Sequence, residues 1–133
     1  MINFIQLGNG SALNPEMTNS SFLVKNDKQY MLVDCGYNVF TELYKNKDVL
    51  NGITHICITH MDDDHIGSLR ALMYYLYFKQ GVVPTIICDK SIEFQLKTYL
   101  LEHSGTVKNY AKVPIKLFEL IALDTNYDFF FRF

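Results

Sequence analysis

The chain has 133 residues, which is enough for one compact domain and short for two. Hydrophobic residues make up 49% of it and charged residues 20%, so the composition predicts a buried core and excludes disorder. A formal net charge of −2, with no run of Lys and Arg, supplies no long-range attraction for nucleic acid or an anionic membrane.

The cysteines form an odd and widely spaced set, Cys35, Cys57 and Cys88, with no C-x-x-C pair. This pattern argues against a disulfide framework or an all-cysteine zinc site and favours a reducing, cytoplasmic setting. Cys35 has no basic neighbour in the sequence, so we predict a small buried side chain rather than a nucleophile. No apolar stretch approaches the ~18 residues of a membrane span, so we expect a soluble protein without a membrane partner.

Apolar runs, several of them alternating with polar residues, predict the strands of the fold. They lie at residues 2–7, 21–24, 30–33, 54–59, 85–88 and 113–121. Asn26, Asp27 and Lys28 have the turn chemistry of a hairpin between the second and third of these runs. Four Phe among residues 129–133 suggest a further strand.

Helices are predicted between and after these strands. Asn38 is the expected N-cap of a short helix. Apolar residues recur at helical spacing over residues 66–77, and Gly81 is the predicted end of that helix. Ser91 is expected to cap a last helix that runs to about His103. Strands at the front, followed by alternating strands and helices, favour a mixed α/β layered fold.

The loop His60-Met61-Asp62-Asp63-Asp64-His65 concentrates ligand-type side chains. It follows a predicted strand and precedes a predicted helix, where α/β folds tend to place ligand sites. In an extended loop His60, Asp62 and Asp64 point to one side and His65 to the other, so they can serve two neighbouring metal positions. Imidazole suits zinc and other first-row metals, and carboxylates tolerate manganese or iron.

A plainer interpretation makes Asp64 a helix N-cap and the other aspartates solvated loop charges. It leaves two histidines that flank three aspartates unexplained, so spacing alone favours metal binding. An EF-hand is excluded because the loop lacks Gly at its sixth position and Glu at its twelfth.

Three ordered segments together resemble one known superfamily. Residues 59–67, Thr-His-Met-Asp-Asp-Asp-His-Ile-Gly, are similar to the T-H-x-H-x-D-H-x-G signature of the metallo-β-lactamase superfamily. Residues 7–12 with 19–21 resemble the "L-G-T-G-S-A … N-S-S" opening of its ribonuclease Z-like branch. Residues 32–36, Leu-Val-Asp-Cys-Gly, resemble its "L-I-D-C-G" strand end.

The resemblance implies an αββα sandwich with a site for two divalent metal ions, most often zinc, with manganese or iron as alternatives. His60 and Asp62 would serve the first metal, and Asp64 and His65 the second. Asp64 would also orient or deprotonate the attacking water. Asp34 would support the loop from behind, a role that fixes ligand orientation.

Two departures from the family pattern limit this assignment. Position 62 is Asp where the family usually has His, which favours a harder metal ion. Family members also supply a later His, Asp and His, whereas His103 is the only histidine after His65 here. Asp89, Asp124 and Asp128 could stand in for the later Asp, but none is followed by the expected partner His. Residues 1–133 are therefore expected to form a single, truncated domain, the first half of the sandwich.

The sequence leads to two functional hypotheses. The first is a metal-dependent hydrolase close to the ribonuclease Z-like phosphodiesterases, acting on a small nucleotide or an RNA phosphodiester. A homodimer or a separate partner would then complete the domain. The alternative is a non-catalytic half-domain that serves as an interaction module or is a remnant.

Overall fold

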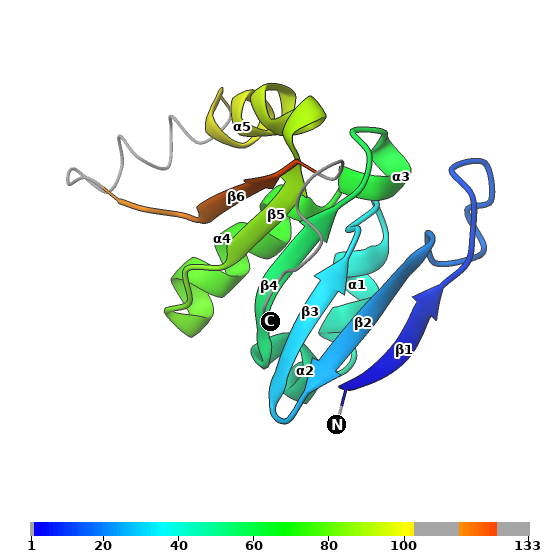
Figure 1. The fold of residues 1–133 in the computed structure, drawn as a ribbon. Coiled ribbons are helices and arrows are strands. Elements are labelled where there is room, and N and C mark those ends of the chain that lie inside the picture. The colour runs from blue at the N-terminus through cyan, green and yellow to red at the C-terminus, as the bar shows by residue number, and fades with distance from the viewer. Residues whose placement is uncertain (1, 103–114, 125–133) are drawn as a thin grey trace.

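The computed structural model describes residues 2–102 and 115–124, and its centre is a six-stranded sheet (Figure 1). The strands lie in chain order from β1 to β6. They are β1 (Ile2–Gly8), β2 (Ser21–Asn26), β3 (Gln29–Val33), β4 (Ile53–Ile58), β5 (Thr85–Asp89) and β6 (Glu119–Leu123). Neighbours are antiparallel from β1 to β3 and parallel from β3 to β6, so the carboxyl ends of β3 to β6 share one edge.

Helices connect the strands and lie mainly on one face of the sheet. They are α1 (Val39–Tyr44), α2 (Lys47–Asn51), α3 (Asp63–Ile66), α4 (Leu69–Gln80), the 3-10 helix η1 (Lys90–Ile92) and α5 (Glu93–Glu102). Figure 1 shows α1, α2 and α4 behind the sheet and α3 beyond the end of β4. No helix in residues 2–102 or 115–124 is long and apolar enough to cross a membrane.

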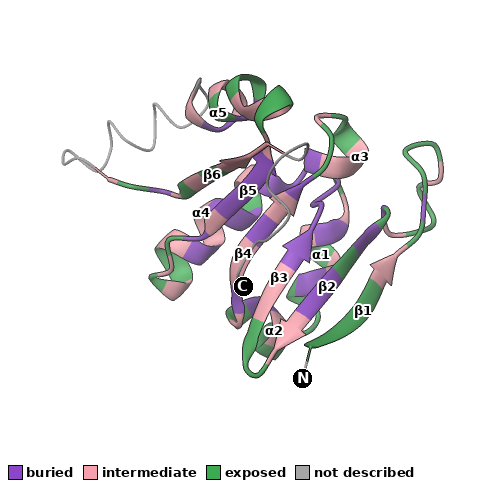
Figure 2. Ribbon diagram, viewed as in Figure 1, coloured by how far each residue is buried: buried purple, intermediate pink, exposed green. Residues whose placement is uncertain are grey.

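The core contains a row of aliphatic side chains on neighbouring strands, on the face of the sheet that these helices cover. Leu23, Leu32, Ile56 and Ile86 occupy paired positions on β2 to β5, and each is at most 1% exposed. Helices α1, α2 and α4 cover them with buried residues, among them Leu43, Leu50, Leu69, Leu72, Met73 and Leu76. Burying one such side chain contributes about 1.5–3 kcal/mol. Figure 2 shows this buried band and, in contrast, the exposed edge strand β1.

Most predicted elements are confirmed, including the hairpin between β2 and β3. Asn26 pairs with Gln29, so Asp27 and Lys28 form a two-residue turn. Asp27 has φ 55, the left-handed conformation that Asp adopts more easily than most residues. Gly81 ends α4 with φ 66, as the predicted helix stop requires.

Other predictions differ from the structure. Helix α2 is not predicted, and the helix expected from residue 66 is two helices that break at Gly67 and Ser68. Asp89, not Ser91, caps the turn before α5, because its carboxylate accepts from Ser91 N at 2.9 Å. Strand β6 begins at Glu119, later than expected. His103, the start of the strand predicted at 113 and the Phe-rich segment lie outside the described residues.

Candidate metal centre

The candidate site lies where β3 and β4 end side by side. Asp34 directly follows β3, and Thr59 and His60 directly follow β4. The backbone N–H of Asp34 donates to Cys57 O at 2.8 Å, which keeps the two strand ends paired up to the site. The parallel register therefore brings residues 34 and 59 together although they are far apart in the chain.

Asp34 is the buried anchor of this edge. Its Oδ1 accepts from Thr59 N at 2.8 Å, and its Oδ2 accepts from Thr59 Oγ1 at 2.6 Å. His65 Nδ1 lies 2.7 Å from the same Oδ2. The side chain of Asp34 is only 8% exposed, so these partners replace the water that a carboxylate would otherwise need. The role of Asp34 as a support behind the metal ligands stays a prediction.

Asp34 also has an uncommon backbone conformation. Its φ is 63, in the left-handed region that costs an L-residue roughly 1 kcal/mol or more. Ser21 Oγ donates to Asp34 O at 2.9 Å, so backbone and side chain are held together. The turn redirects the chain at the end of β3 and leaves the carboxylate facing the His/Asp loop.

The residues after Asp34 hold helix α3 against the strand end. Cys35 N donates to His65 O at 2.7 Å, and Ser68 N donates to Cys35 O at 3.1 Å. Ser68 Oγ accepts from Phe40 N at 3.1 Å and donates to Gly36 O. The loop that carries the candidate ligands is thus tied to the sheet on both sides of His65.

Gly36 permits the closest approach in this region. A Cβ atom at Gly36 would overlap the backbone oxygen of Asp64 and Oδ1 of Asn19, and backbone atoms cannot rotate away. Asn19 is fully buried, and its N–H donates to Asn38 Oδ1 at 2.7 Å. Asn38 stands at the N-cap of α1 as predicted, but its side chain makes no capping bond and holds the segment before β2.

The structure places His65 beside two of the other three predicted ligands, His60 and Asp64. The rings of His60 and His65 lie 4.7 Å apart between centroids, and His65 Nε2 lies 3.5 Å from Asp64 Oδ2. Asp62 is exposed, and its carboxylate makes no hydrogen bond or ion pair with any described residue. It is Asp62, not Asp64, that stands at the N-cap of α3, and its side chain makes no capping bond.

These donors fit a divalent transition metal in type but form an incomplete set. Two imidazoles and a carboxylate are the ligands that zinc and similar ions prefer. Within residues 2–102 and 115–124, no group of three or more His, Cys, Asp or Glu side chains is close enough to hold a metal ion. The other histidine in this region, His55, lies in β4, where burial lowers its pKa and Nδ1 contacts Thr54 Oγ1 at 2.8 Å.

Thr59, Ser21 and Ser68 complete the hydrogen bonding of the site, and sequence reasoning gives them no role. Thr59 directly precedes the His/Asp loop, and its hydroxyl also lies 3.0 Å from His60 Nδ1. The only sequence signal for Thr59 is its position next to the loop. Its hydrogen bonds to Asp34 depend on strand pairing, which the sequence does not show.

The three thiols have raised pKa values, which makes them poor nucleophiles near neutral pH. Burial raises the pKa of Cys35 to about 12, and Asp34 adds to this effect. Burial likewise raises the pKa of Cys57 and of Cys88 to about 11. Cys35 is fully buried, which confirms the predicted small core side chain.

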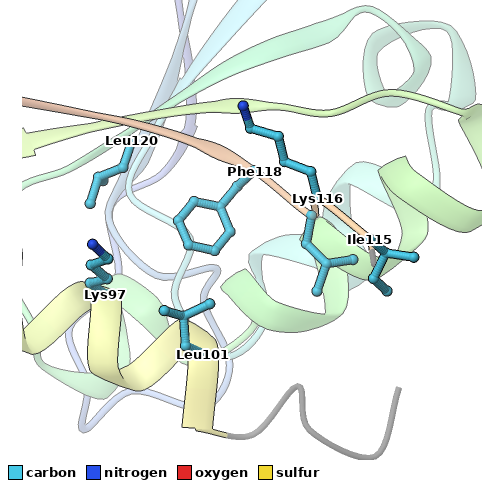
Figure 3. Close-up of a pocket in the computed structure, with 7 residues that line it drawn as sticks. Lys97, Leu101, Ile115, Lys116, Phe118 and Leu120 are labelled. Atoms are coloured by element: carbon cyan, nitrogen blue, oxygen red, sulfur yellow. The ribbon is translucent and has the colours of Figure 1, made fainter. Parts of the chain in front are cut away.

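A cavity of about 290 Å³ lies elsewhere, between α5 and the segment that leads into β6 (Figure 3). It is lined by Lys97, Leu101, Ile115, Lys116, Leu117, Phe118 and Leu120. Phe118 points its ring toward Lys97 and Leu101 of α5. Among the described residues of its lining none carries a carboxylate or an imidazole, so they do not repeat the chemistry of the His/Asp loop.

Comparison with known proteins identifies the family. A family model described as "Anti-Pycsar protein Apyc1" matches residues 2–131. The chain belongs to the anti-Pycsar protein Apyc1 family. An Apyc1 protein of Paenibacillus xerothermodurans is 29% identical over 121 residues, which cover 89% of this chain and 48% of that relative. A protein named ribonuclease Z from Alkaliphilus oremlandii is 32% identical over 103 residues, which cover 76% of this chain and 32% of that protein.

Solved structures give the fold of this Apyc1-family chain. The short form of human tRNase Z superposes with a TM-score of 0.66 at 22% identity, covering 92% of this chain and 44% of that one. YhfI of Bacillus subtilis, a metallo-β-lactamase fold protein, superposes with a TM-score of 0.63 at 16% identity, covering 92% and 45%. The predicted metallo-β-lactamase-type fold is confirmed. The chain spans about half the length of the Apyc1 relative and of these structures.

Proposed function

We propose that this chain carries the first part of the metal site of a hydrolase that cleaves phosphodiester bonds with water. The observation that supports it best is the position of His65, which lies beside both His60 and Asp64 at the carboxyl edge of β4. It occurs in a chain whose relatives are named Apyc1 and ribonuclease Z.

Each residue would have a separate task. His60 and Asp62 would bind one divalent ion, and Asp64 and His65 a second, with zinc preferred and manganese or iron as alternatives. Bound ions would supply positive charge that stabilises the phosphate oxygens and lowers the pKa of the attacking water. Asp64 would orient that water and hold its proton, and Asp34 would keep His65 in place.

A small nucleotide is the substrate class we favour over long RNA. Tight RNA binding depends on many contacts between Lys or Arg and phosphates, and the net charge here is −2. Because the chain spans about half of its Apyc1 relative, the remaining ligands would come from further sequence or from a partner chain.

The test combines metal binding with hydrolysis. Zinc binding by calorimetry and cleavage of bis-p-nitrophenyl phosphate would be measured for the chain, for a His60→Ala, Asp64→Ala double variant and for Asp48→Asn. Asp48 is an exposed acid on α2, so its variant is a matched control for lost charge. We expect zinc binding in the wild type and Asp48→Asn, and its loss in the double variant.

Equal zinc binding by the wild type and the double variant would contradict the proposal. Failure of the wild type to bind zinc would favour the second function, a non-catalytic half-domain that acts through its surface. The exposed apolar residues of β1 are the observation behind that alternative, with Ile2 59% and Phe4 74% exposed.

A further inference from the structure

The hydroxyl of Thr59 lies between two side chains of the site. It donates to Asp34 Oδ2 at 2.6 Å and lies 3.0 Å from His60 Nδ1. A hydroxyl has a single hydrogen, and here that hydrogen goes to the carboxylate. Toward His60 the oxygen therefore has only lone pairs to offer, so His60 Nδ1 must be the donor.

His65 reaches the same state by a direct contact. Its Nδ1 lies 2.7 Å from Asp34 Oδ2 and, at a longer 3.4 Å, from Thr59 Oγ1. An ionised carboxylate only accepts hydrogen bonds, so His65 Nδ1 carries the hydrogen as well. In a neutral imidazole, a hydrogen on Nδ1 leaves the lone pair on Nε2, which is then the atom able to bind a metal.

We propose that Thr59 is a positioning residue whose hydroxyl extends the influence of Asp34 to His60. One buried carboxylate then sets both imidazoles as Nδ1–H tautomers, directly for His65 and through Thr59 for His60. This inference rests on the proposed function, because the freed Nε2 atoms matter only if the histidines bind metal. The selection itself exists in the metal-free chain and can be measured there.

The hydroxyl can be separated from the structural role of the same residue. Thr59 N also donates to Asp34 Oδ1 at 2.8 Å, a backbone bond that joins the ends of β3 and β4. A Thr59→Val variant keeps that bond and the β-branched shape and removes only the hydroxyl. A Thr59→Ser variant restores the hydroxyl without the methyl group, so it serves as the conservative rescue.

The decisive measurement is the tautomer of each histidine by long-range proton–nitrogen NMR on metal-free protein. The spectra are recorded at alkaline pH, because a single tautomer is defined only for a neutral imidazole ring. We expect His60 and His65 both to carry the hydrogen on Nδ1 in the wild type and in Thr59→Ser. In Thr59→Val, His60 should move toward the Nε2–H form while His65, bonded directly to Asp34, stays unchanged as an internal control. A His60→Gln variant assigns the His60 signals.

Two results would overturn the inference. One is a wild-type His60 that carries its hydrogen on Nε2, an observation that needs no variant and no assumption about folding. The other is an unchanged His60 tautomer in Thr59→Val, provided that circular dichroism and the unfolding midpoint show a folded variant.

A second measurement tests whether the tautomer of His60 affects metal binding. It is the zinc affinity, determined by competition with a chromophoric chelator. Loss of a residue that orients a ligand weakens metal binding by roughly 10–100-fold, and we expect a loss of that size in Thr59→Val. Thr59→Ser should stay close to the wild type. Unchanged zinc affinity in Thr59→Val would refute the positioning role. A wild type that binds no zinc would instead refute the proposed function, and the NMR result would then decide the tautomer inference by itself.

Discussion

His65 Nδ1 lies 2.7 Å from the carboxylate of Asp34, although the two residues are 31 positions apart in the chain. Two parallel strands and one short helix are needed to produce that contact, since Asp34 follows β3 and His65 lies in α3. The contact therefore depends both on the fold and on the organisation of the candidate site.

Asp34→Asn should destabilise the protein and weaken metal binding. The amide retains one oxygen, so the hydrogen bonds from Thr59 and His65 cannot all be kept. Hydrogen bonds to a charged group contribute about 1.5–3 kcal/mol each, and we expect a loss of about that size in the free energy of unfolding by urea. The Asp48→Asn control should change it by less than about 0.5 kcal/mol. Equal unfolding curves for the two variants would refute the anchoring role of Asp34.

Gly36→Ala should be more damaging than Gly81→Ala. The new methyl group at position 36 would meet the backbone oxygen of Asp64, whereas Gly81 has open space around it and a φ of 66, which strains alanine but not glycine. We expect a cost of about 3 kcal/mol for the first by overpacking and about 1 kcal/mol for the second by left-handed strain. Thermal or urea unfolding measures both. Zinc binding should be impaired only by Gly36→Ala; the reverse ranking of stabilities would be evidence against the tight packing.

The three cysteines should react slowly with thiol reagents while the protein is folded. Their pKa values are raised to about 12 for Cys35 and about 11 for Cys57 and Cys88, so little thiolate is present near neutral pH. Labelling with a disulfide reagent should proceed at least about 100-fold more slowly than for a free peptide thiol. Unfolding in guanidinium should make all three thiols react as fast as free thiols. Fast labelling of one thiol in the folded state would reveal an opening of the structure at that residue.

The same pKa shifts predict the alkaline limit of stability. A folded pKa above the ordinary value of 9.0 means that the unfolded chain loses its thiol protons first. Stability should be fully present below pH 9.0 and should fall as the pH rises toward about 11 and 12. Urea midpoints across this range measure the slope. A Cys57→Ser variant removes one of the three contributions and should flatten it; an identical slope would contradict the assignment.

The sheet core should tolerate truncation far less than the exposed helix face. Ile56 is fully buried in the central strand β4, and Ile56→Ala should cost about 2–5 kcal/mol. Phe94 on α5 is 80% exposed, so Phe94→Ala should change the free energy of unfolding by less than about 0.5 kcal/mol. Comparable losses in the two variants would mean that residue 94 is covered in solution.

Short sequence patterns predict much of this fold, because many of its turns and helix ends are determined by neighbouring residues. The hairpin at Asp27, the end of α4 at Gly81 and the strand before His60 all depend on residues within a few positions. Helix α2 is missed because its five residues are too few for a clear period. The cap of the turn before α5 is misassigned because Asp89 and Ser91 both have capping chemistry, and the geometry selects Asp89.

The candidate site is predictable only as a cluster of residue types. The sequence places His60, Asp62, Asp64 and His65 in one loop, but it does not show that Asp62 is exposed while the others converge. It also gives no access to the role of Thr59, which depends on the register between β3 and β4. Long-range pairing carries this information, and a single sequence does not express it.

The strand order of the sheet has a consequence for how the chain folds. Because β1 to β6 lie side by side in chain order, each strand from β2 to β6 pairs with a strand that precedes it in the sequence, and this order suits folding during synthesis. Among the described strands none is inserted between two others, although the parallel pairs are joined by crossover segments that include helices. The His/Asp loop, which follows the fourth strand, can therefore be organised by Asp34 before β5 and β6 pair with the sheet.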